Sequence, residues 1–83
     1  MKRLRNKPRE KIKWDLDSLG NLISINRAVL VMDGNITVLR PLYIIVSNEV
    51  GVEVLKINTY NKLYENQSGK VFNTVEDAMK YSG

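Results

Sequence analysis

The sequence predicts an α+β fold, in which a mainly antiparallel β meander forms a curled sheet or small barrel and carries a short C-terminal helix. Three observations support this prediction: several short apolar runs separated by turn residues, an Asp-Gly pair between two branched apolar runs, and a helix-capping pattern near the C-terminus. The chain has 83 residues, enough for one small domain with a thin stability margin.

The first two strands are expected between residues 12 and 26. Residues 12–17 alternate apolar Ile, Trp and Leu with Lys and Asp, which is the pattern of a half-buried strand. The turn residues of "SLGN" (18–21) follow, and "LISIN" (22–26) resumes with branched residues. Residues 18–32 also fit a helix capped by Ser18, although Gly20 and the branched residues favour strands.

A β-hairpin is predicted over 28–39, where "AVLVM" and "NITVL" flank Asp33-Gly34. Asp-Gly is a preferred pair for a two-residue type I′ turn, because both positions require positive φ. Pro41 interrupts the run that follows, so it marks a bend or an edge strand.

Two further strands and a last hairpin are expected between residues 42 and 72. "LYIIV" (42–46) is apolar without alternation, and "VEVLKIN" (52–58) contains adjacent Val and Leu, which suggests a bulge or burial on both faces. The segment 60–72 resembles a hairpin whose turn lies at 66–69.

A short helix is predicted over 74–81. Thr74 can cap it, with Asp77 in the capping-box position, and Asn73 with Glu76 offers the same arrangement one residue earlier. Val75, Ala78 and Met79 would form its single apolar stripe.

The two apolar runs create a problem of burial, because one short helix cannot cover both faces of a sheet. A small barrel would cover itself, whereas an open sheet needs a second subunit. We expect a symmetric homodimer whose interface uses residues of 28–32 or 42–46.

The composition argues against an enzyme, since the chain has neither Cys nor His. It therefore lacks the commonest metal ligand and the commonest general base near neutral pH. We expect no catalytic residue, no metal site and no cofactor; an RNA-cleaving toxin using Lys, Arg and Tyr is a third reading of the chain. The longest apolar runs are far shorter than a membrane span, so we expect a cytoplasmic protein with no membrane partner, in the host cytoplasm if it is viral.

Charge divides the chain into two parts. Seven of the first thirteen residues are Lys or Arg, opposed by Glu10, for a local charge of +6. Residues 14–83 carry six basic and eight acidic side chains, for −2. We expect residues 1–11 to form a flexible basic arm and residues 12–83 a single β-rich domain, because a block of like charge does not pack into a core.

The arm is read in two ways, as a solvated tail or as a segment that binds a polyanion. The leading prediction is a small non-enzymatic DNA- or RNA-binding protein that uses the arm on phosphates, with an acidic protein as the other partner considered. The alternative is a protein-interaction module or inhibitor from a phage or mobile element, acting through an exposed sheet face or edge. The candidate phosphate-binding residues are Lys2, Arg3, Arg5, Lys7, Arg9, Lys11 and Lys13, and the candidates for base stacking are Trp14, Tyr60 and Tyr64.

Overall fold

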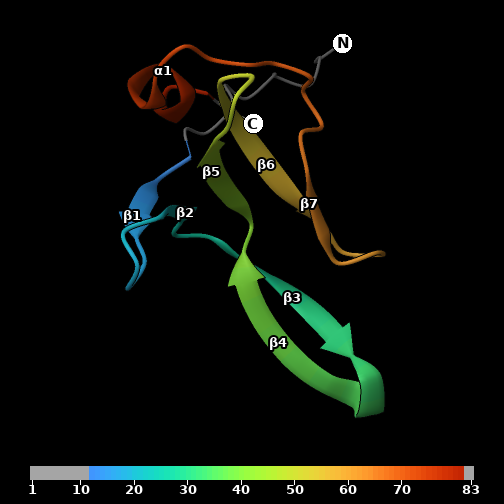
Figure 1. Cartoon of the computed structure of the whole chain (residues 1–83). Coiled ribbons are helices and arrows are strands. Elements are labelled where there is room, and N and C mark those ends of the chain that lie inside the picture. Colours follow the sequence, from blue (N-terminus) through green and yellow to red (C-terminus); the bar gives the residue numbers. More distant parts are fainter. Residues whose placement is uncertain (1–11, 82–83) are drawn as a thin grey trace, which may run out of the picture.

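The structure, a computed structural model, describes residues 12–81, so the predicted arm at 1–11 lies outside the described part of the chain. Seven strands and one short α-helix are present in that part (Figure 1). They are β1 (Trp14–Leu16), β2 (Leu22–Ser24), β3 (Arg27–Met32), β4 (Ile36–Pro41), β5 (Tyr43–Ser47), β6 (Val52–Asn58), β7 (Leu63–Glu65) and α1 (Val75–Met79).

Five of the strands form one antiparallel sheet in the order β1-β2-β5-β6-β7, and β3 and β4 form a separate two-stranded sheet. The predicted antiparallel meander with a short C-terminal helix is confirmed, but the sheet stays open and does not close into a barrel. The meander contains one long detour, because β3 and β4 are inserted between the sheet neighbours β2 and β5. Figure 1 shows this β3–β4 hairpin pointing away from the sheet, at the end opposite α1.

The predicted hairpin is confirmed, but its turn is longer than expected. Met32 pairs with Ile36, so three residues, Asp33–Asn35, connect the strands and the two-residue turn prediction is wrong. Gly34 takes a φ of 77° and Asn35 a φ of 63°. Asparagine tolerates the left-handed region better than most other side chains. Asn35 therefore becomes the third residue of the turn, and β4 begins at Ile36.

The helical alternative for 18–32 is wrong, because this segment contains β2 and β3. The turn that precedes β2 is stabilised by the carboxylate of Asp17, whose Oδ1 accepts from the backbone N–H groups of Leu19 and Asn21. A side chain that accepts hydrogen bonds from backbone N–H groups a few residues later favours a turn over a helix.

The predicted last hairpin is wrong in its pairing. Strand β7 pairs with β6 across a turn at 59–62, and Phe72 forms an isolated bridge with Val52 at the other end of β6. The turn signal at 66–69 marks a loop between these two contacts: the Asn66 side chain accepts from the Gly69 N–H and donates to the Lys70 carbonyl. The segment 63–72 therefore runs along one edge of β6.

Two small hydrophobic clusters lie on opposite faces of β6. Val54 and Ile57 are three residues apart in that strand, so their side chains point to opposite sides. Of the two alternatives for 52–58, a bulge or burial on both faces, the structure has burial on both faces, and the strand pairs in continuous register. The helix-side core consists of Ile45, Val52, Val54 and Ala78, and the hairpin-side core consists of Ala28, Leu30 and Ile57.

The C-terminal helix begins as predicted and is shorter than predicted. The Thr74 hydroxyl accepts from the Asp77 N–H at 3.1 Å and caps α1. Ala78 is fully buried, whereas Val75 is 37% and Met79 38% exposed. One short helix therefore covers only part of one sheet face.

Candidate interaction surface

Hydrogen bonds around Ser24 anchor the hairpin where it leaves the sheet. The buried Ser24 hydroxyl donates to the Asn26 carbonyl at 2.8 Å and accepts from the Tyr43 N–H at 2.9 Å. The Leu42 N–H donates to the same Asn26 carbonyl at 3.0 Å. The chain thus leaves the sheet and returns to it at one hydrogen-bonded point, beyond which β3 and β4 pair mainly with each other.

One face of the hairpin is buried and the other is exposed. Ala28 and Leu30 point inward and pack against Ile57 of the sheet. The alternate residues point outward, and the register places Val29 opposite Leu39 and Val31 opposite Thr37. We call Val29, Val31, Thr37 and Leu39 the outer face.

The outer face is apolar and exposed to a degree that calls for a function. Val29 is 57%, Val31 60% and Leu39 59% exposed. Single exposed apolar side chains are ordinary on a protein surface, whereas a contiguous group of them is a candidate interaction surface. The expectation of an interface within 28–32 singled out half of this face. Leu39 and Thr37 were missed, because the predicted two-residue turn would have placed Val38 opposite Val29 and Ile36 opposite Val31.

A second apolar row lies on the five-stranded sheet. Ile23 pairs with Ile44, and Ile44 pairs with Leu55, so these side chains cross three strands on the face opposite α1. All three are half-buried. Because the hairpin covers the neighbouring Ile57 and continues outward, this row is less exposed than the outer face and ranks second as an interface.

Positive charge gathers at the base of the hairpin. Arg27 and Arg40 occupy neighbouring positions in the β3–β4 ladder, close to Tyr64, whose hydroxyl donates to the Pro41 carbonyl at 2.6 Å. Burial raises the pKa of Tyr64, and the charges of Arg40 and Arg27 oppose that rise. The hairpin is therefore basic at its base and apolar along its length.

Most of the predicted phosphate-binding residues lie outside the described part of the chain. Lys13 is described and exposed, immediately before β1. Those outside the described residues are Lys2, Arg3, Arg5, Lys7, Arg9 and Lys11.

Of the predicted stacking residues, Trp14 belongs largely to the core. Its ring packs against the helix-side core, and its Nε1 donates to the Met79 carbonyl at 3.3 Å. This contact joins the first strand to the C-terminal helix, so Trp14 has a structural role where the expected arm meets the domain.

Tyr60 and Tyr64 do not form the shared strand face that their spacing suggested. Tyr60 is 92% exposed in the turn at 59–62, where Lys62 has a φ of 63°. Tyr64 lies in β7, half-buried against the hairpin-side core. A turn breaks the period-2 relation between the two rings, so only Tyr60 offers an open ring.

Asparagine side chains hold the carboxylates of the sheet. The amide of Asn48, followed by that of Asn66, lowers the pKa of Glu53, and the amides of Asn61 and Asn58 lower the pKa of Glu65. The four donor–acceptor distances are 2.6, 2.9, 3.0 and 3.2 Å in that order. The many asparagines in the sequence did not indicate which carboxylates they would bond.

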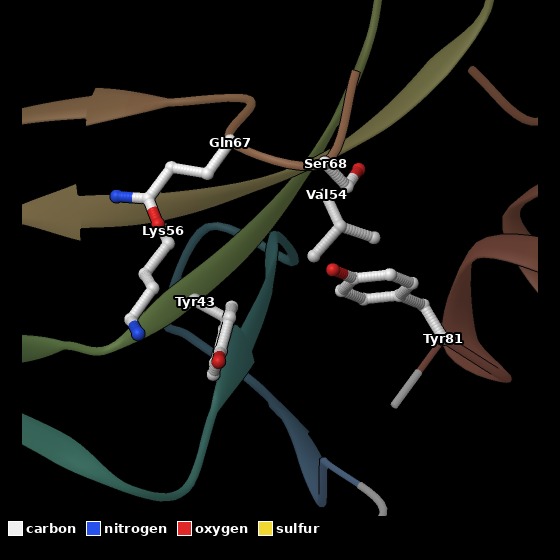
Figure 2. Close-up of a pocket in the computed structure, with 6 residues that line it drawn as sticks. All are labelled: Tyr43, Val54, Lys56, Gln67, Ser68 and Tyr81. Atoms are coloured by element: carbon white, nitrogen blue, oxygen red, sulfur yellow. The ribbon is translucent and has the colours of Figure 1, made fainter. Parts of the chain in front are cut away.

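A small recess lies beside the helix-side core (Figure 2). Its volume is about 90 Å³, and Tyr43, Lys56 and Tyr81 are among its lining residues. The Lys56 ammonium lies 5.7 Å from the centre of the Tyr43 ring, a cation–π contact. The recess is well below the size of typical ligand pockets, so it does not compete with the outer face as a binding site.

Among residues 12–81, no group of three His, Cys, Asp or Glu side chains is arranged to hold a metal ion. Within the same range no helix has the length and hydropathy needed to cross a membrane.

Comparison with models of known protein families, with curated proteins and with solved structures finds no match for this chain.

Proposed function

We propose that this protein is a small interaction module that binds another protein surface through the outer face of the β3–β4 hairpin. The observation that carries the proposal is the apolar exposure of Val29, Val31 and Leu39 on a ribbon anchored at its base. Burying such side chains on binding is favourable, and a ribbon already in its bound shape loses little conformational entropy.

The chemistry of the outer face favours a protein over nucleic acid. A two-stranded ribbon has dimensions that the major groove of DNA admits. Reading bases requires hydrogen-bonding side chains, however, and of the four outer-face residues only Thr37 has one. Arg27 and Arg40 at the base would attract phosphates, but Asp33 at the tip would repel them. An apolar, weakly charged surface is the better match for such a ribbon.

A photo-crosslinking amino acid at Val29 tests the proposal in cells. Tyr60 is the matched control, because it is exposed and lies in the turn at 59–62, outside the hairpin. We expect discrete crosslinked products from position 29 and none from position 60. Equal labelling from both positions, or none from either, would contradict the proposal.

A second candidate function is nucleic-acid binding by the basic N-terminal residues. The uneven charge favours it: +6 over the first thirteen residues against −2 over the rest. DNA or RNA phosphates are the partner that matches such a segment, and an acidic protein is the competing one. We keep the expectation of a cytoplasmic protein as part of both proposals.

Salt dependence tests the second candidate. If the basic residues make roughly five phosphate contacts, affinity should fall several hundred-fold between about 50 and about 200 mM salt. Deleting residues 2–11 should abolish most binding and leave the thermal midpoint nearly unchanged. A truncated chain that binds DNA and RNA as well as the full chain would exclude this candidate.

A further inference from the structure

The outer edge of β3 has no strand neighbour in the described part of the chain. Strand β3 has six residues and one strand neighbour, β4, so its other edge presents unpaired backbone groups. Between residues 28 and 32 it contains no charge, no proline and no glycine. Unprotected edges of this kind pair readily with another strand.

The other three strand edges are short or protected. Strands β1 and β7 have three residues each, and both contain a carboxylate, Asp15 and Glu65. Strand β4 ends in Arg40 and Pro41, and proline cannot donate to a ladder. Natural sheets use these same devices to prevent edge pairing. In β3 the charged Arg27 at the base is such a device, and residues 28–32 contain none.

We propose that β3 pairs with β3 of a second copy of this chain, antiparallel and about a two-fold axis at Leu30. This inference rests on the proposed function: the partner is a second copy of this chain, bound along the edge of β3, and the outer-face residues Val29 and Val31 meet across the new strand pair. It joins two hairpins into a four-stranded sheet in the order β4-β3-β3-β4. The interface is symmetric, as most protein dimers are.

Charge complementarity selects the register. With the two-fold axis at Leu30, Arg27 stands opposite Asp33 of the partner subunit, and the dimer contains this pair twice. An axis at Val29 places Arg27 against Val31 of the partner subunit, and an axis at Val31 places it against Asn35 of the partner subunit. The register at Leu30 is the one of these three that joins opposite charges.

The same register joins the apolar side chains. Val29 stands opposite Val31 of the partner subunit on the outer face, where cross-strand pairs of branched residues stabilise a sheet. The two outer faces then form one continuous apolar surface. The hairpin projects from the sheet (Figure 1). In an antiparallel pairing the two bodies would therefore extend in opposite directions from the joined ribbons.

Cysteine pairing tests the register directly, because the native chain contains no cysteine. Full-length Val29→Cys and Val31→Cys proteins are mixed and oxidised. Directly opposed positions have Cβ atoms within reach of a disulfide, whereas positions offset by two residues are about 7–8 Å apart. We expect the mixed disulfide to exceed its share under random pairing. An excess of either self-disulfide would overturn the proposed register.

A charge swap tests the pairing without cysteine. Arg27→Glu and Asp33→Arg each oppose like charges twice in the dimer, and each should weaken association roughly ten-fold. The double variant R27E/D33R restores opposite charges and should return association to near that of the native chain. Light scattering should give twice 9.5 kDa for the native and double variants at high micromolar concentration. Double-variant association as weak as that of either single variant would overturn the charge pair.

The crosslink from position 29 separates failure of this inference from failure of the proposed function. A product containing two copies of this chain supports both. The second outcome is a crosslinked product that contains a different protein, together with a mass of 9.5 kDa for the purified chain in solution. It would overturn pairing with a second copy and would still support the proposed interaction module. No product together with a monomeric mass overturns both.

Discussion

Strands β3 and β6 show how poorly the hydrophobicity of a strand reports its burial. "AVLVM" of β3 is wholly apolar, yet only Ala28 and Leu30 are buried. "VEVLKIN" of β6 contains Glu and Lys, yet three of its residues are buried, because the strand has a neighbour on each edge and a hydrophobic cluster on each face. The number of elements packed against a strand determines its burial, and fewer elements pack against the hairpin than against β6.

The largest difference between the two regions should appear when isoleucine is truncated. Ile57→Ala in β6 removes a side chain that is 4% exposed and shared by the hairpin and the sheet. We expect a loss of about 3 kcal/mol in the free energy of unfolding. Ile36→Ala at the hairpin tip, where the side chain is 61% exposed, should cost less than about 0.5 kcal/mol. Urea denaturation measures both, and equal losses would mean that the hairpin tip is packed.

Glycine replacement should separate a clash from backbone strain alone. A Cβ at Gly51 would meet the Phe72 carbonyl oxygen at 2.9 Å, at a φ of +146°. A Cβ at Gly34 would meet nothing within 4 Å, at a φ of +77°. We expect Gly51→Ala to cost more than about 2 kcal/mol and Gly34→Ala about 1 kcal/mol. Thermal denaturation of the two variants checks the order, and a costlier Gly34→Ala would contradict it.

The same change of valine to threonine should be costly in the sheet and nearly silent in the hairpin. Val54→Thr buries a hydroxyl in the helix-side core, where Val54 is 4% exposed, and should cost about 2 kcal/mol. Val31→Thr keeps a branched side chain at a position that is 60% exposed and should change the free energy of unfolding by less than about 0.5 kcal/mol. Chemical denaturation at low micromolar concentration excludes a contribution from association. A large loss for Val31→Thr there would show that the outer face is covered within one chain.

The smallest effect is expected from acid, and it should act on the sheet. Hydrogen bonds from Asn21, Asn48 and Asn61 are the leading causes that lower the pKa of Asp17, Glu53 and Glu65 from ordinary values of 3.8, 4.5 and 4.5. A lowered pKa in the folded state contributes stability above the ordinary value, and this contribution is lost as the pH falls through the folded value.

Denaturation midpoints from about pH 6 to about pH 3 should therefore fall, and Glu53→Gln with Glu65→Gln should flatten the fall. A double variant that keeps the full slope would show that the asparagine bonds do not affect stability.

Local sequence patterns predicted most strands and turns, because alternation and turn residues act over a few positions. They could not determine which strands pair. The sequence "NQSG" (66–69) correctly indicates a turn, but a hairpin and a loop along one edge require the same turn residues. The contacts that decide between them are distant: Phe72 pairs with Val52, and Asn66 bonds to Glu53.

The candidate surface was predictable only in part for the same reason. An apolar run such as 28–32 must be buried against something. We therefore expected an interface in 28–32 or in 42–46. Whether a side chain finds that cover depends on the path of the chain beyond the strand. Leu30 meets Ile57, while Val29 and Val31 point away from the sheet. That path is set at Ser24 and Leu42, where Pro41 signals a bend or an edge but not the direction of the chain.

The insertion of the hairpin between β2 and β5 has a consequence for the order of folding. Ser24 and Tyr43 are 19 residues apart in the chain, so joining them first would close a sizeable loop at an entropic cost. A hairpin forms within about 1–10 μs. Once β3 and β4 have paired, Arg27 lies opposite Pro41. Only a few residues then separate the two sheet strands, so the ribbon acts as a nucleus that brings them together. On this route Gly34→Ala slows folding more than it speeds unfolding.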